Sequence, residues 1–233
     1  GAVVSKKKLA KILYFSVLLS FIVPIVFLVV KITVYSINDD LTLPRPISDY
    51  LLMLLECILG VIVIHFPTFL ERRFRFVVPS NLYYMYLIFL YCAIFLGEIR
   101  DFYYLVPGWD VILHTFSSLM SGSFGFMVVD ILNRNEHTHM SLSPLFVSVF
   151  AFCFALSIGA LWEIYEYSFD GLLGLNMQKY RLADGTQLVG HAALSDTMKD
   201  IVMDTIGALA ASILGFFQLQ LERRRKKSAK GDT

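Results

Sequence analysis

The chain alternates between long apolar runs and short polar breaks. Its six runs of about twenty apolar residues are separated by segments that carry charge, proline or glycine. A run of this length crosses the hydrocarbon core of a bilayer as an α-helix, because a helix satisfies its own backbone polar groups. We therefore predict an all-α integral membrane protein, a bundle of six transmembrane helices forming a single domain over residues 1–233. The expected spans are about 9–30, 47–66, 81–99, 111–132, 144–167 and 199–221.

Lysine and arginine gather at three places that six spans would bring to the same side. These are the arm before the first span (6–11), the loop after the second (71–75) and the tail (222–227). The positive-inside rule makes that side cytoplasmic. We expect both termini in the cytoplasm, a location in the plasma (inner) membrane, and an external loop between the fifth and sixth spans.

The composition agrees with this class of protein. Hydrophobic residues make up 57% of the 233 residues, and the mean hydropathy is +0.65, which is too apolar for an ordinary soluble domain. A net charge of +1 gives no case for nucleic acid as a partner, so membrane lipid is the expected one. The motifs of zincins, α/β-hydrolases and P-loop proteins are absent. The oligomeric state stays open.

A row of aspartates opens the sixth span. Asp196, Asp200 and Asp204 are spaced i, i+4 and i+8 and so share one face of a helix. The residues that follow, 206–211, are small and apolar, so Asp204 is carried into the bilayer. An ionisable side chain there is costly and indicates a functional site by default. We read Asp196 as a solvated residue or a helix cap.

Further ionisable residues fall at the same level of the predicted bundle, at the outer ends of other spans. They are Glu98 of the third span, Asp110 and His114 of the fourth, Glu163 and Glu166 of the fifth, and the deeper Glu56 of the second. Asp110 and His114 are one turn apart, as are Glu163 and Glu166. The outer half of the bundle is therefore predicted to hold one layer of carboxylates with an imidazole.

Such a layer cannot stay fully ionised in low dielectric, because like charges raise one another's pKa. It needs a divalent cation, shared protons, or pairing with basic residues, and the nearest of these (Arg100, Lys179, Arg181 and Lys199) are expected at the surface. Oxygen ligands with one imidazole suit Mg²⁺, Mn²⁺, Ca²⁺ or Zn²⁺, among which the sequence does not choose. The predicted ligands of this cation are His114, Glu163, Glu166, Asp200 and Asp204, with Glu98 and Glu56 as further candidates.

Two classes of function stay open. In the first, a membrane enzyme, the cation polarises an oxygen of a lipid or lipid-linked headgroup or activates a water. The catalytic residues would be His114 and Asp110, with Asp110 orienting His114 or acting as a base. In the second, a cation- or proton-coupled transporter, the same carboxylates bind and release their cargo. A transporter would need polar residues that continue from the outer layer toward the cytoplasmic side. Glu56 is the only acidic residue that clearly lies deeper than this layer, so we favour the enzyme. A scaffold for envelope maintenance with a structural metal site is a third option.

Three segments resemble the YjdF-like family of bacterial multi-pass inner-membrane proteins. They are Trp109-Asp110 with His114, the WEIYE stretch at 162–166, and DTMKDIVMDTIG at 196–207. The resemblance covers roughly residues 80–220. It implies a bacterial inner-membrane protein but supplies no reaction.

Two more distant likenesses concern the same residues. The order Asp110, His114, Glu163 or Glu166, Asp200 and Gly207 is similar to that of the VanZ-like proteins linked to glycopeptide-antibiotic tolerance, which usually have asparagine where this chain has Asp204. The aspartate row also resembles the DxxxDxxxD row that holds Mg²⁺ and a diphosphate in intramembrane prenyltransferases. The second, asparagine-containing row of that family is absent, so only its chemistry is a guide.

The charge distribution makes a prediction about topology. A cysteine placed at Gly185 should react with an impermeant thiol reagent added from outside, whereas one placed at Ser228 should be protected, because the basic segments hold both termini inside. The reverse labelling pattern would show that the orientation, and with it the outer-leaflet position of the acidic layer, is wrong.

Overall fold

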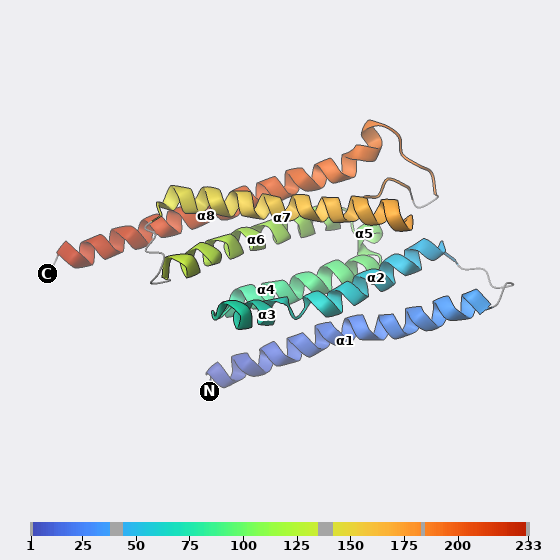
Figure 1. Ribbon diagram of the computed structural model, residues 1–233, viewed down its shortest axis with the longest axis horizontal. Coiled ribbons are helices and arrows are strands. Elements are labelled where there is room, and N and C mark those ends of the chain that lie inside the picture. Colours follow the sequence, from blue (N-terminus) through green and yellow to red (C-terminus); the bar gives the residue numbers. More distant parts are fainter. Residues whose placement is uncertain (1, 38–43, 135–141, 183–184, 232–233) are drawn as a thin grey trace. The chain divides into compact units, whose positions relative to one another are not determined.

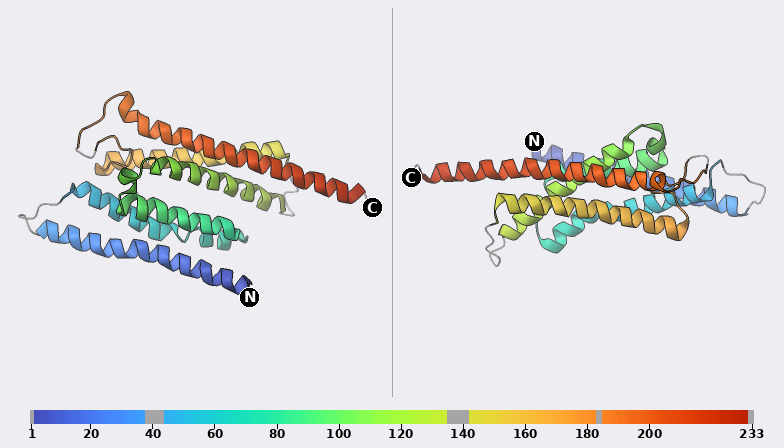
Figure 2. Two further views of the ribbon diagram at one scale, coloured as in Figure 1. Left: turned by 180° about the vertical axis from the view of Figure 1, so that it is seen from behind. Right: turned by 90° about the horizontal axis from the view of Figure 1, so that it is seen from above.

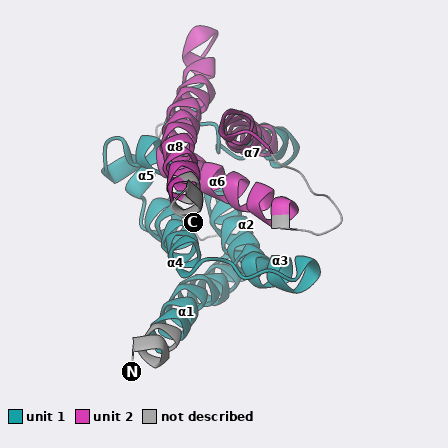
Figure 3. Ribbon diagram, turned by 90° about the vertical axis from the view of Figure 1, so that its left-hand side faces the viewer, with its two compact units in different colours: residues 1–113, 166–187 teal, residues 114–165, 188–233 magenta. Residues whose placement is uncertain are grey.

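The computed structural model describes residues 2–37, 44–134, 142–182 and 185–231. Backbone contacts divide the chain into two units, each described here by itself (Figure 3). Unit 1 comprises Gly1–Leu113 and Glu166–Gln187, and unit 2 comprises His114–Tyr165 and Leu188–Thr233. The single domain predicted from the sequence stays a prediction. The predicted loops at 38–43 and 135–141 lie outside the described residues.

The all-α fold class is confirmed. Within the part of the chain that the structure describes, six helical segments are long and apolar enough to cross a membrane: Lys8–Ile37, Ile47–Phe74, Ser80–Ile99, Trp109–Asn133, Pro144–Leu173 and His191–Arg225. Each predicted span falls inside one of them. A helix of this composition is stable in lipid because its backbone groups bond to one another.

Unit 1 is built on the N-terminal helices, which lie side by side (Figure 1). Its elements are α1 (Ala2–Ile37), α2 (Ile47–Val63), α3 (Phe66–Phe74), α4 (Ser80–Leu90), the π-helix η1 (Tyr91–Ile99) and α5 (Phe102–Leu105). Gly60 of α2 lets the helices approach closely, since a Cβ there would lie 2.8 Å from Ile94 Cδ1 and 3.0 Å from Phe21. Phe21 is fully buried in the resulting core.

Pro67 explains why the second span is broken between α2 and α3. A proline has no N–H, so it cannot bond to the carbonyl four residues earlier, which here belongs to Val63. The Tyr86 hydroxyl of α4 donates a hydrogen bond to that carbonyl at 2.5 Å. A side chain of a neighbouring helix therefore satisfies the acceptor that the proline leaves open.

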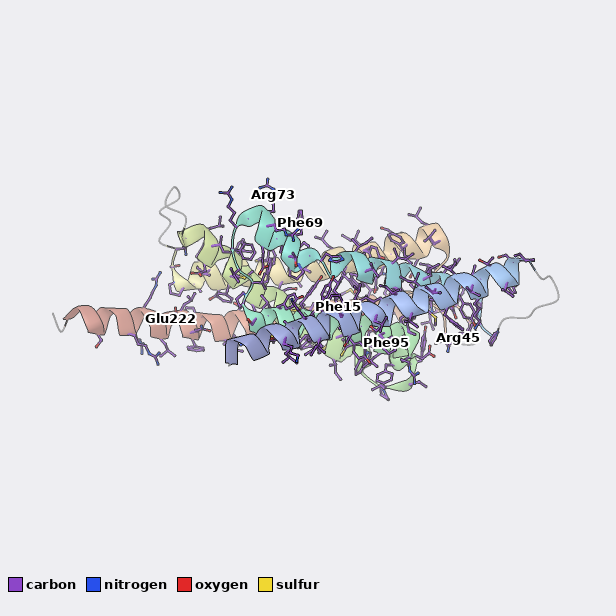
Figure 4. All side chains as sticks on the ribbon, turned by 90° about the horizontal axis from the view of Figure 1, so that it is seen from below. Phe15, Arg45, Phe69, Arg73, Phe95 and Glu222 are labelled. Carbon is purple, nitrogen blue, oxygen red and sulfur yellow. The ribbon has the colours of Figure 1, made fainter. Side chains whose placement is uncertain are left out.

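The basic segment after the second span is helical, which corrects the loop expected at 71–75. Helix α3 runs through Phe74 and ends at Arg75, whose φ of 55° lies in the left-handed region. Phe69, 58% exposed, and Arg73 project from α3 to the surface (Figure 4). Aromatic and basic side chains together are typical of the membrane interface.

Unit 2 consists of three helices that run along one another (Figure 2). They are α6 (Trp109–Arg134), α7 (Pro144–Leu173) and α8 (His191–Gly231), of which residues 109–113 and 166–173 belong to unit 1. Small residues hold them together, because a Cβ on Gly122 of α6 would lie 2.6 Å from Ala211 Cβ of α8, and one on Gly125 would lie 3.0 Å from Ala151 Cα of α7. Such close approach is how membrane helices associate.

The connection between the fifth and sixth spans is shorter than expected. We anticipated a loop of some thirty residues, but α7 continues to Leu173 and α8 begins at His191. Asp196 therefore lies in the second turn of α8 and is half-buried, so it is not the cap of this helix. His191 is the first residue of α8.

The contact between Tyr86 and Val63 predicts a coupling with Pro67. Tyr86→Phe should lower the free energy of unfolding by about 1–2 kcal/mol, because it leaves a buried carbonyl without a donor. In a Pro67→Ala background the restored N–H can bond to Val63, so the same change should cost much less. Unfolding titrations of the two single variants and the double variant measure this coupling, and equal costs in both backgrounds would contradict it.

Candidate functional site

The site of unit 2 is centred on His114 of α6, which faces two aspartates of α8. Its Nδ1 atom lies 3.4 Å from both carboxylate oxygens of Asp204, and its Nε2 atom lies 3.7 Å from Oδ2 of Asp200. All three side chains are buried, with Asp204 only 1% exposed. Both ring nitrogens are therefore directed at carboxylates one helical turn apart.

Glu163 of α7 adds a third carboxylate. It is 5% exposed, and the charges of His114, Asp204 and Asp196 act on it. Thr197 interacts with the same carboxylate, but neither Glu163 oxygen makes a close, well-aligned hydrogen bond with the described residues, and Oδ1 of Asp204 has only its 3.4 Å contact with Nδ1 of His114. Buried polar atoms are nearly always bonded, so these three oxygens need a proton or a cation.

Small residues on the neighbouring helices create the space for Asp204. A Cβ on Gly159 of α7 would overlap the Asp204 carboxylate, and one on Gly207 of α8 would lie 2.5 Å from the Thr115 carbonyl of α6. The Ser118 hydroxyl donates a hydrogen bond to the Asp204 carbonyl at 2.5 Å. Ser118 follows His114 by four residues and Gly159 precedes Glu163 by four, so the helical spacing around the predicted ligands could have identified both.

Unit 1 holds a second group of acids, which we call the unit 1 cluster: Glu56 of α2, Glu98 of η1, Asp110 of α6 and Glu166 of α7. The charges of the other three act on Glu56. Tyr103 of α5 packs against η1, where a Cβ on Gly97 would lie 2.5 Å from its ring. Burial, together with these four carboxylates, raises the pKa of Tyr103 well above its usual value, so its hydroxyl stays a neutral donor.

Lys179, one of the basic residues expected at the surface, supplies a positive charge to the unit 1 cluster. Its ammonium group forms an ion pair with Asp110 and lies 4.9 Å from the centre of the Tyr103 ring. The Lys179 side chain is 23% exposed. The orienting role predicted for Asp110 toward His114 stays a prediction; within unit 2, the carboxylate at Nδ1 of His114 is that of Asp204.

Hydrogen bonds to the C-terminal end of α7 hold the segment that carries Lys179. The Asp170 carboxylate accepts hydrogen bonds from the backbone N–H groups of Met177 (2.8 Å) and Gln178 (3.0 Å). Arg181 donates to the carbonyls of Gly174 and Leu175, both at 2.8 Å. Because Leu175 and Met177 are buried as well, residues 174–181 hold a defined conformation.

A second ion pair of unit 1 lies on the connections between its helices. Arg45, which precedes α2, donates two hydrogen bonds to the Asp101 carboxylate, each of 2.6 Å. The position of Arg45 is labelled in Figure 4. The hydrogen bonds to Asp101 raise the pKa of Arg45 above its ordinary value, so the guanidinium group stays charged and its bonds to Asp101 join the two connections.

The predicted site residues are assigned here by unit. His114, Glu163, Asp200 and Asp204 come together in unit 2, and Glu166, Glu98, Glu56 and Asp110 belong to unit 1. Asp196 was expected to be solvated, yet its charge acts on Glu163. The catalytic and ligand roles assigned to these residues from the sequence stay predictions.

A family model of predicted membrane proteins, DUF2238, matches residues 14–221. The chain belongs to this family. The match confirms the resemblance to the YjdF-like family, which is the same family, and with the six apolar helices it establishes a multi-pass membrane protein. No curated protein and no solved structure matches the chain. The likeness to VanZ-like proteins and the location in a bacterial inner membrane stay predictions.

The space that Gly159 provides predicts a sensitive position. Gly159→Ala should lower the melting temperature by about 5 °C, because the added methyl group overlaps the Asp204 carboxylate and displaces it. Gly171→Ala is the matched control on the same helix, since a Cβ there has nothing within 4 Å. Melting curves in detergent compare the two, and equal melting temperatures would show that Asp204 is not confined by Gly159.

Proposed function

We propose that this protein is a membrane-embedded enzyme whose unit 2 holds a divalent cation on His114, Glu163 and Asp200, with Asp204 orienting the imidazole. The proposal depends on one observation, the burial of three carboxylates around a single imidazole with three of their oxygens unbonded. His114 must be neutral if Nε2 is to contact a metal, so the three carboxylates carry the charge. One divalent cation offsets two of their negative charges, and a proton on one carboxylate offsets the third.

The orientation of His114 suits a ligand. Metal-binding histidines usually donate one ring N–H to a carboxylate, which sets the tautomer and leaves the other nitrogen for the metal. Asp204 faces Nδ1 of His114, and Asp200 faces Nε2. We therefore expect Asp204 to orient the imidazole through Nδ1, while Nε2 and the Asp200 carboxylate contact the cation. Mg²⁺, Mn²⁺, Ca²⁺ and Zn²⁺ all accept such a mixed set.

The depth of the site favours a lipid or lipid-linked substrate. Glu163 and Asp204 belong to helical segments that are apolar enough to span a membrane. Leu161 and Ile164, which flank Glu163 on α7, are 60% and 59% exposed, as expected for side chains that face lipid. A cation beside Glu163 would polarise a phosphoryl or acyl oxygen of a headgroup entering from the bilayer.

Packing within unit 2 speaks for an enzyme over a transporter. Beyond Asp204, α8 contacts α6 at Gly207 and again at Gly122 and Ala211, where the backbones approach closely. A transport route through these three helices would have to separate them at each of these contacts. An enzyme site that opens sideways to lipid at the level of Glu163 needs no such movement.

Removing one carboxylate tests the proposed cation. Asp204→Asn keeps the size of the side chain but removes its negative charge, so it should abolish bound metal and all activity that depends on it. Asp130→Asn, which changes an exposed carboxylate on α6, is the control and should leave both unchanged. Elemental analysis of the purified proteins measures the metal, and incubation with a lipid extract followed by mass spectrometry, with and without a chelator, measures turnover.

The same experiment separates the proposal from a cluster that only shares protons. In that case the wild type contains no metal, and its melting temperature does not change when Mg²⁺, Mn²⁺, Ca²⁺ or Zn²⁺ is added. Asp204→Asn would then stabilise the protein by relieving repulsion between carboxylates. That combination of results would overturn the metalloenzyme.

A further inference from the structure

The negative charge of the unit 1 cluster is offset by an ammonium group that belongs to the chain itself, that of Lys179. Its carboxylates come from four different helical elements, α2, η1, α6 and α7, whereas the cation comes from the connection after α7. The ammonium group of Lys179 pairs with Asp110, and its charge also acts on Glu56 and Glu98. The helices thus bring the carboxylates together, and a separate segment places an ammonium group among them.

The surroundings of the ammonium group are those of a site for an organic cation. Its Nζ atom lies over the face of Tyr103, 4.9 Å from the ring centre, and an aromatic face attracts ammonium groups through its quadrupole. The Asp110 carboxylate accepts a hydrogen bond from the group. A metal ion gains little from an aromatic ring, so this combination selects an alkylammonium ion.

The segment 174–181 is built to present this one side chain. Lys179 itself has φ of 49°, a left-handed conformation that non-glycine residues seldom adopt. The bonds of Asp170 and Arg181 and the burial of Leu175 fix the chain around it. A lysine that served only to solubilise a loop would not need these constraints.

We infer that the unit 1 cluster is a binding site for a primary alkylammonium ion, and that the side chain of Lys179 occupies it as a tethered ligand. The inference does not rest on the cation proposed for unit 2. Its ligand class follows from the contacts of Lys179 with Asp110 and Tyr103, since these recognise an N–H-bearing cation on an apolar stem.

Chemical rescue of a truncated lysine tests the inference. Lys179→Ala removes the tethered ammonium group and leaves the carboxylates of the helices in place, so its melting temperature should fall by about 5 °C. Ethylammonium chloride should restore about half of that loss by entering the vacated site. Tetramethylammonium chloride at the same concentration controls for ionic strength and has no N–H donor for Asp110, so it should restore much less.

Two further variants keep the test decisive. Lys179→Met retains the apolar stem without the charge and should melt as low as Lys179→Ala, which also covers the case in which the alanine variant does not fold. Lys199→Ala, an exposed lysine of α8, should melt like the wild type, with or without ethylammonium. The inference is overturned if Lys179→Met melts like the wild type, or if ethylammonium stabilises Lys179→Ala no more than tetramethylammonium does.

Discussion

A carboxylate buried in a membrane protein has to be matched by a proton or a positive charge, and the arrangement of polar residues in both units follows from this constraint. Removing a charge from water costs several kcal/mol, which exceeds what packing around it returns. Asp204 is buried as completely as the core residue Phe21, so its partners are a condition for folding. His114 approaches it from α6 for this reason.

The two units meet the constraint in different ways. In unit 1 the positive charge is covalently part of the chain, because Lys179 reaches Asp110 from a segment that Asp170 and Arg181 hold in place. In unit 2 three buried carboxylates lie around one imidazole. Unit 1 thus pairs an acid with a cation of its own chain, whereas for unit 2 we propose a cation from outside.

Small residues are the second requirement, because they decide how deeply a polar side chain is buried. Gly159 leaves the volume that the Asp204 carboxylate fills, and Gly207 lets α8 approach the backbone of α6. Larger residues at these positions would hold the helices apart and admit lipid or water beside the aspartate. In unit 1, the absence of a side chain at Gly97 lets the Tyr103 ring pack closely onto η1.

Much of this protein was determined by the sequence alone. Hydrophobic run length sets the number and place of the spans, since a membrane helix depends on local composition and on backbone bonds within the helix. The unusual positions of Asp204, Glu163 and His114 were evident for the same reason, because a polar residue inside an apolar run needs no tertiary structure to be noticed.

The tertiary structure decided which of these residues meet. Helical periodicity tells which side chains share a face but not which helix that face contacts, so it could not separate Glu166 from Glu163, one turn apart on α7 and assigned to different units. It also could not place Lys179, whose position depends on hydrogen bonds from Asp170 and Arg181 across an irregular segment. Where regular structure ends, the local pattern no longer determines position, and long-range contacts do.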